Sequence, residues 1–277
     1  MLFTICWIMF FYVKETSIID LSVINRDSEN KGRETIPMEI FSLPNSKYSF
    51  RDCPLYQCKY KTLNNTLFLN YGELSQVNIK NIPFCSDILF NRLLIFDGFS
   101  RQFSIPYYIS FGTLLGSFLM QDIFPWTQDL DVVIPDHSLL ALLGNEVIVE
   151  HLKRTGLIIF RGGNRLARMC FDSHGIRRPN TLRRTKEFLN LSIYMDVSAE
   201  FKKSNESIMM NPSSCVFKQN DIYPLGRCNI RNHFFPCPRN VTKVLENHYG
   251  KGYGVANDER NIIWDGIGCN NNHNNQK

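Results

Sequence analysis

Residues 107–134 read YYISFGTLLGSFLMQDIFPWTQDLDVVI, and this stretch decides the fold of the chain. The β-favouring residues 107–111 predict a strand, which ends at a Gly-Thr turn. The apolar run 114–120 then predicts the start of a buried helix, and residues 129–134 predict a second strand that a proline stops. This order of strand, tight turn, helix and strand is typical of a mixed α/β domain.

The second strand places two carboxylates on one face. Side chains in a strand alternate between its faces, so Asp129 and Asp131 point the same way. The apolar residues that pack behind them are Leu130, Val132 and Ile134. Like charges at this spacing repel and raise each other's pKa unless a cation lies between them. Because oxygen ligands suit hard cations, we predict Mg²⁺ or Mn²⁺ at this pair.

A third aspartate belongs to the strand predicted at residues 191–197. Asp196 lies on the polar face of this strand, opposite its apolar residues. An Asp-x-Asp pair alone is weak evidence for a site, because strand ends and surface faces produce it freely. The turn before the pair and the strand-borne Asp196 after it favour a site in which Asp129, Asp131 and Asp196 bind the metal and carry the catalysis.

The Gly112-Thr113 turn has a chemistry of its own. Glycine lets the backbone approach a phosphate, the Thr113 hydroxyl can donate a hydrogen bond, and the next helix offers unpaired amides at its positive end. We predict that Gly112 and Thr113 bind substrate phosphate. The alternative is structural: Gly112 and Gly116 only permit a strand and a helix to pack closely.

Other segments surround this core. Periodicity and turn residues predict a helix from an N-cap at Ser86, a helix from Leu139 to about Arg154 capped by Asp136 and Ser138, and a hairpin at residues 157–171 turning on Gly162-Gly163-Asn164.

Composition and the two ends of the chain bound its organisation. With 277 residues, 44% of them hydrophobic, the chain is long enough for one catalytic domain, predicted at residues 81–269. Residues 1–13 are apolar, short for a spanning helix and without a cleavage site, so we expect a signal-anchor there. A cleaved signal peptide and a buried strand are the alternatives. Residues 14–80 predict an irregular stem, and the Asn-rich residues 270–277 a disordered tail.

Cysteines and glycosylation triplets agree with a secretory protein. Nine cysteines are present, and eight lie outside the leader, an even set that favours disulfides. Small loops can close between Cys53 and Cys58 and between Cys228 and Cys237, but the sequence does not choose the pairing. A zinc site that adds His174 or His233 to cysteines is the alternative, although no Cys-x-x-Cys pair exists. Asn-x-Ser/Thr triplets lie at Asn64, Asn190, Asn205 and Asn240.

Several segments, in order, resemble the LicD and fukutin family of the nucleotidyltransferase superfamily. They are residues 110–116 (SFGTLLG), 125–126 (PW), 129–131 (DLD), 223–227 (YPLGR), 236–240 (PCPRN), Leu245 and 249–250 (YG). The resemblance covers about residues 84–264. It implies a mixed α/β (α+β) fold with a central mixed sheet flanked by helices. Members often show a run of acids where this chain has Thr127 and Gln128. The two aspartates needed to bind one metal ion are kept, whereas the binding of a second ion is left open.

The resemblance also implies an activity. The family transfers phosphocholine or a polyol phosphate, such as ribitol phosphate, from a CDP-linked donor to a glycan, glycoprotein or glycolipid. Asp129 and Asp131 would hold the metal, and Asp196 would complete its coordination and take the proton of the attacking hydroxyl. Arg227 lies in the family's Pro-Leu-basic element and would contact donor phosphate, with a surface charge as the alternative.

Location and partners follow from the same features. We expect a single-pass type II protein of the Golgi or ER lumen, held in the membrane by its N-terminal apolar segment, or else a secreted protein. A net charge of +5 is too small for a dense basic stripe, so nucleic acid is not an expected partner. The second function class is a secreted or membrane-tethered glycan-binding module that keeps the fold without the chemistry.

Overall fold

The computed structural model of the chain describes residues 43–63, 79–125, 127–163, 165–172, 188–210 and 215–250. The expected leader (1–13), the expected tail (270–277), Asn64 and His174 lie outside these residues. Among the described helices, none combines the length and the apolar character needed to cross a membrane.

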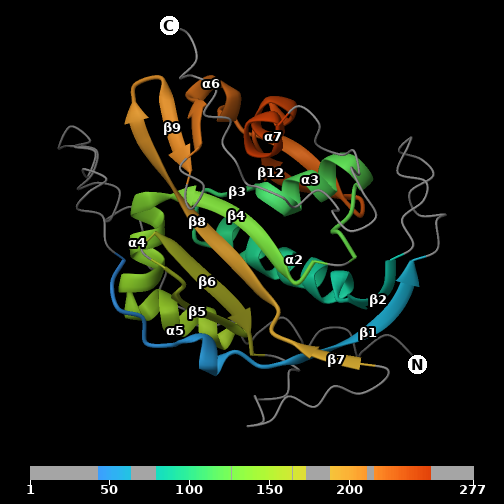
Figure 1. Ribbon diagram of the computed structural model, residues 1–277. Coiled ribbons are helices and arrows are strands. Elements are labelled where there is room, and N and C mark those ends of the chain that lie inside the picture. The colour runs from blue at the N-terminus through green and yellow to red at the C-terminus, as the bar shows by residue number, and fades with distance from the viewer. Residues whose placement is uncertain are drawn as a thin grey trace, which may run out of the picture. The chain divides into compact units, whose positions relative to one another are not determined.

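A seven-stranded mixed sheet forms the centre of the described part of the chain (Figure 1). Its two central strands, β4 (Asp129–Pro135) and β8 (Tyr194–Ser204), run parallel, and all its other pairs are antiparallel. The remaining strands are β3 (Tyr108–Ile109), β5 (Leu157–Arg161), β6 (Leu166–Phe171), β9 (Ser207–Met210) and β10 (Cys215–Lys218). The predicted α/β fold with a central mixed sheet is thus confirmed.

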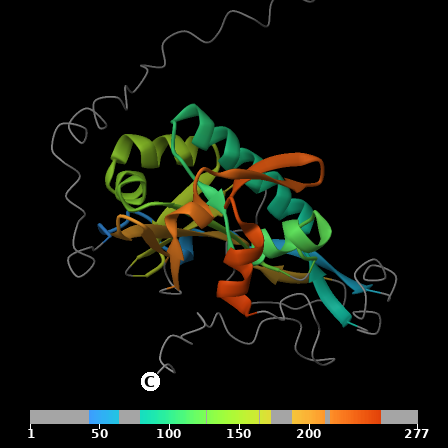
Figure 2. The ribbon, with the colours of Figure 1, turned by 90° about the horizontal axis from the view of Figure 1, so that it is seen from above.

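Helices cover both faces of this sheet. Figure 2 shows α2 (Ser86–Gln102), α4 (Asp136–Gly144) and α5 (Glu146–Arg154) on one side and α7 (Val241–Tyr249) on the other. The helix α3 (Phe111–Met120) joins β3 to β4, and the short α6 (Gln219–Ile222) follows β10. The apolar side chains of β4, which are Leu130, Val132 and Ile134, are fully buried. Their burial fixes which face of β4 is left for polar residues.

Three sequence predictions need correction in detail. The helix expected from 139 to 154 is two helices, because Asn145 accepts hydrogen bonds from the amides of Val147 and Ile148 and starts α5 anew. The strand expected at 191–197 is also divided: β7 (Phe188–Leu191) joins another sheet, and β8 begins at Tyr194. The helix α2 has Cys85 at its N-cap, with Ser86 as its first residue. The predicted hairpin is confirmed as β5 and β6.

A second, three-stranded sheet lies in the order β2 (Ile79–Phe84), β1 (Tyr56–Leu63) and β7, and all its pairs are antiparallel. The 3₁₀ helix η1 (Phe50–Asp52) precedes it. Leu43, Leu55 and Tyr56 are buried, so part of the segment expected as an irregular stem contributes to the core. The domain boundary expected at residue 81 stays a prediction.

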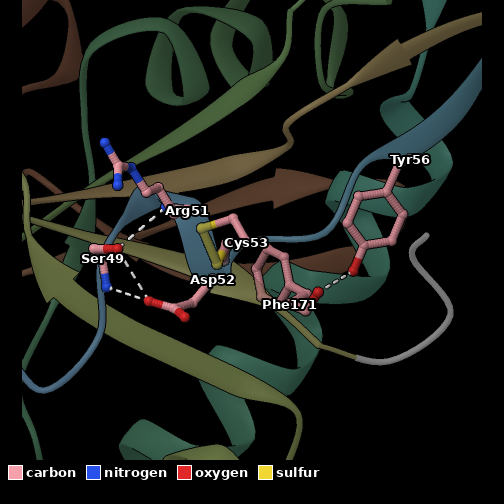
Figure 3. Close-up of a disulfide and its surroundings, with 7 residues drawn as sticks. Ser49, Arg51, Asp52, Cys53, Tyr56 and Phe171 are labelled. Carbon is pink, nitrogen blue, oxygen red and sulfur yellow. Dashed lines mark hydrogen bonds between the residues drawn. A yellow bond between two sulfur atoms is a disulfide. The ribbon is translucent and has the colours of Figure 1, made fainter. Parts of the chain in front are cut away.

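Disulfides connect these parts. Cys53 bonds to Cys170 of β6, with the two Cα atoms 5.7 Å apart, and the Tyr56 hydroxyl donates to the carbonyl of Phe171 beside it (Figure 3). The suggested loop between Cys53 and Cys58 is therefore wrong. This cross-link joins positions 117 residues apart, which sequence spacing cannot indicate.

The second suggested loop is confirmed. Cys228 bonds to Cys237 across the hairpin of β11 (Gly226–Ile230) and β12 (His233–Cys237). Cys85 and Cys215 are disulfide-bonded as well. Cysteines in disulfides cannot bind zinc as thiolates, so the zinc alternative loses these ligands.

Candidate active site

The three predicted aspartates meet at the centre of the large sheet. In the parallel pairing of β4 with β8, Asp131 lies opposite Asp196, and Asp129 lies opposite Tyr194. One carboxylate oxygen from each aspartate lies within 4.8 Å of those of the other two, and all three residues are half-buried. The structure therefore brings together the group that the sequence analysis proposed from two separate strands.

Electrostatics make this cluster costly without a partner of opposite charge. Burial, and next the neighbouring Asp129 and Asp196, raise the pKa of Asp131 well above its ordinary value. Burial also raises the pKa of Asp196, which the Arg168 guanidinium lowers and Asp129 raises again. Three carboxylate oxygens at this distance form the donor set that hard divalent cations prefer. The residues thus fit Mg²⁺ or Mn²⁺, and the identity of the ion stays a prediction.

The first turn of α3 holds Asp131 in place. The Gly112 amide donates to Asp131 Oδ2 at 3.0 Å, and the Asp131 amide donates to the Thr113 hydroxyl oxygen at 2.8 Å. A backbone bond from the Ser110 amide to the Asp131 carbonyl, 3.1 Å long, completes the contact. Gly112 and Thr113 belong to the helix rather than to a turn before it. In this structure they bind the aspartate, and their contact with substrate phosphate stays a prediction.

The backbone at this point is strained. Phe111 has a φ of 44°, in the left-handed region that a bulky side chain rarely adopts. Strain of this kind persists only where the surroundings over-determine it, and it often marks functional sites. Here Phe111 is buried, and its ring packs 4.3 Å from that of His248. The strained residue turns the chain so that the next amide, that of Gly112, meets Asp131.

Gly116 has the structural role that was considered for it. A Cβ atom at Gly116 would lie 2.6 Å from the carbonyl oxygen of Asp122, a backbone atom that cannot easily move. This close approach packs α3 against the loop that leads into β4, and so fixes where Asp129 starts the strand.

Arg168 is a site residue that the sequence analysis missed. It lies on β6 directly opposite Asp196, and its Nε donates to Asp196 Oδ1 at 2.8 Å. Its guanidinium lies 4.8 Å from the centre of the Tyr194 ring, which orients it. The alternation of the predicted hairpin would have placed Arg168 on a polar face. Only the pairing of β6 with β8 shows that this face is the one of Asp196.

Thr127 lies two residues before Asp129 and contacts it. Its hydroxyl donates to Asp129 Oδ1 at 2.7 Å and thereby orients the carboxylate. The Oδ2 atoms of Asp129 and Asp196 accept no hydrogen bond from any residue that the structure describes, so both remain available to a ligand. Thr127 therefore helps to position the Asp129 carboxylate.

His248 closes the apolar side of the site. It is fully buried between the rings of Phe111 and Phe217, and its Nε2 lies 3.5 Å from the Ser110 hydroxyl. Burial lowers the pKa of His248 to about 3, so the imidazole is neutral at physiological pH. We assign it a packing role behind the first turn of α3.

Arg227 lies apart from the aspartates. Its exposed guanidinium stacks 5.3 Å from the ring centre of Phe234 and lines a cavity of about 500 Å³. Tyr107, whose hydroxyl donates to Asp97 of α2, lines the same cavity. Its neighbour Tyr108 pairs with Val133, on the face of β4 that carries the aspartates, so Tyr107 points to the opposite face. None of the aspartates lines this cavity, and the contact of Arg227 with donor phosphate stays a prediction.

Comparisons with known proteins agree with this site. Residues 104–240 match the family described as LicD/FKTN/FKRP, nucleotidyltransferase domain. A comparison with curated proteins found no match. Among solved structures, the chain is similar to the lincosamide antibiotic adenylyltransferase LnuA with lincomycin bound. That similarity has 16% sequence identity and a TM-score of 0.35, covers 61% of this chain and 90% of LnuA, and is too weak to support a conclusion. The matched segment contains Gly112, Thr113 and all three aspartates, so the part of the chain that carries the site is similar to the nucleotidyltransferase domain of the LicD/FKTN/FKRP family.

Proposed function

We propose that the protein transfers phosphocholine or a polyol phosphate, such as ribitol phosphate, from a CDP-activated donor to a glycan, glycoprotein or glycolipid. The proposal rests on one observation above all: three carboxylates and one guanidinium, from three strands, converge on one face of the central sheet. An enzyme of the nucleotidyltransferase kind needs such a cation site beside a phosphate-binding group.

The reaction is an in-line displacement at phosphorus. An acceptor hydroxyl forms the new oxygen–phosphorus bond as the phosphoanhydride bond of the donor breaks, and CMP leaves with the bond's electron pair. Asp129 and Asp131, together with Asp196, would hold Mg²⁺ or Mn²⁺, and the bound ion would supply positive charge to offset that on the phosphate oxygens. Arg168 uses Nε for Asp196, so its terminal nitrogens are the donors for a phosphate oxygen.

Asp196 is also the residue proposed to take the proton of the acceptor hydroxyl. Burial keeps the basicity of this carboxylate above that of an exposed aspartate, while Arg168 holds one of its oxygens. The other oxygen has no partner among the described residues. If Asp196→Asn kept near-normal turnover while Asp131→Asn abolished it, the role of base would be withdrawn.

Location is part of the proposal. The disulfides favour an oxidising compartment, and we propose the Golgi or ER lumen, with residues 1–13 as the membrane anchor of a type II protein or, for a secreted form, as its signal. Of Asn205 and Asn240, the triplets whose side chains the structure describes, Asn205 is the better placed to carry a glycan, because it is exposed in the turn after β8. Asn240 is not, because its side chain caps α7 and bonds Asp221.

The test is release of CMP by the purified full chain with Mn²⁺ and CDP-choline, CDP-ribitol or CDP-glycerol, each with a glycan acceptor. We expect release with one of these donors, its loss on chelation of the metal, and its loss in Asp131→Asn. Arg51→Met, a change at an exposed residue without a role in the site, is the control and should keep full turnover. If no donor gives CMP and neither Mn²⁺ nor CDP raises the melting temperature, the glycan-binding module is the better account.

A further inference from the structure

Tyr249, the last residue of α7, presents a buried phenol that the site as described so far does not use. Its hydroxyl is buried and has no hydrogen-bond partner among the residues that the structure describes. Buried hydroxyls are nearly always paired, and an unpaired one costs free energy unless a ligand or water completes it. Such an atom beside a candidate active site therefore needs an explanation.

The end of α7 is fixed against the residues that hold Asp131. The helix packs on α3, and His248, next to Tyr249 in sequence, lies with its ring 4.3 Å from that of Phe111 and its Nε2 3.5 Å from the Ser110 hydroxyl. Gly250, with a φ of 82°, is the C-cap of the helix directly after Tyr249. The position of the phenol is thus set by packing rather than by a hydrogen bond of its own.

The phenol also lies within the field of the aspartates. Burial raises the pKa of Tyr249, and the carboxylates of Asp131 and Asp129 raise it further, in that order. The geometric basis for placing the phenol beside the aspartates is the packing of α7 on α3, whose first turn binds Asp131. Tyrosine carries its proton at neutral pH, so this hydroxyl is a hydrogen-bond donor without an acceptor.

We propose that the Tyr249 hydroxyl donates a hydrogen bond to a phosphate oxygen of the substrate bound at Asp129 and Asp131. Phosphate oxygens are acceptors only, and in a phosphoryl transfer they carry the charge that the site must stabilise. The donor lies at the end of α7, which packs on α3, and is outside the matched residues 104–240. This inference rests on the proposed function and names one of its catalytic residues.

Tyr249→Phe removes only the hydroxyl and tests the assignment. With the purified full chain, the melting temperature is measured without ligand, with Mn²⁺, and with Mn²⁺ plus CDP, and CMP release is measured with the active donor. We expect an unchanged or higher melting temperature without ligand and an unchanged shift with Mn²⁺. The affinity for CDP, and turnover by kcat, should each fall at least about 10-fold, as for loss of one such donor.

Tyr223→Phe is the matched control. Tyr223 is also a largely buried phenol, but its hydroxyl already donates to Glu200, and Tyr108 donates to the same carboxylate at 2.8 Å. We expect this variant to melt at a lower temperature without ligand and to bind CDP as the unchanged protein does. The two variants thus separate a hydroxyl that stabilises the fold from one that binds substrate.

The other possible results decide between the inference and its alternatives. Unchanged CDP affinity and turnover in Tyr249→Phe would show that the hydroxyl does not contact substrate, and a lower melting temperature without ligand would show a structural partner. Loss of the Mn²⁺ shift would place the phenol at the metal instead of the phosphate. Binding of CDP without CMP release in the unchanged protein would refute the proposed function but leave the Tyr249 comparison valid. If the unchanged protein neither bound CDP nor released CMP, the proposed function and the inference on Tyr249 would both be overturned.

Discussion

Acidification should destabilise this protein through one residue, His248. Its pKa is lowered from 6.5 to about 3 by burial, so in the folded protein it stays neutral where the unfolded chain takes up a proton. The stabilising effect is complete above pH 6.5 and is lost as the pH falls, because the unfolded state binds more protons there. Between pH 7 and pH 5, linkage gives a loss of about 2 kcal/mol in the free energy of unfolding from this residue alone.

The assay is urea unfolding with the disulfides intact, at half-unit steps from pH 7 to pH 5, for the unchanged protein and for His248→Phe. Phenylalanine keeps a ring between Phe111 and Phe217 but has no titrating group. Any change in packing therefore shifts the free energy of unfolding equally at every pH, and only the contribution of His248 to its pH dependence is lost. Asp131, Asp196 and Glu200 have raised folded-state pKa values and act with the opposite sign, stabilising on acidification. They are common to both proteins and cancel in the difference.

The expected result is a difference between the two curves that grows by about 2 kcal/mol as the pH falls from 7 to 5. Parallel curves would refute the reasoning, since they would mean that His248 can be protonated in the folded state at little cost. That outcome would also contradict the packing of its ring against Phe111, on which the position of α7 depends.

The remaining predictions concern the backbone and charge of the site. Gly116→Ala should lower the free energy of unfolding by about 1 to 3 kcal/mol in urea, because the new methyl group would meet the carbonyl of Asp122; an unchanged value would show that the loop yields. Asn145→Ala should cost about 1 kcal/mol by removing the cap of α5, and Asn145→Asp, which keeps it, should cost little. Asp131→Asn should melt higher than the unchanged protein without metal, since two unit charges 4.8 Å apart repel by about 3.5 kcal/mol at an effective dielectric constant near 20. The same variant should lose the Mn²⁺-induced rise in melting temperature, and retention of that rise would exclude Asp131 as a ligand.

Local sequence was informative wherever one strand or one helix decides the outcome. The alternation in β4 predicted that Asp129 and Asp131 share a face, and the apolar residues between them are buried as expected. Prediction from local patterns failed where a regular pattern is interrupted. Asn145 starts a second helix inside an apolar stretch. The segment expected as one strand around Asp196 is divided between two sheets before Tyr194. Periodicity alone does not register these breaks, because a cap or a change of strand partner leaves the apolar spacing intact.

The sequence by itself thus determined the order of the main elements, the pair of carboxylates on one face of β4 and a third acid on a later strand. Tertiary structure alone decided that Asp196 lies opposite Asp131, that Arg168 pairs with it, and that Cys53 reaches Cys170. The physical reason is that side-chain alternation is a property of one strand, whereas register between strands depends on how the whole sheet buries its apolar faces. Contacts between distant segments follow from that register and carry no local signal in the chain.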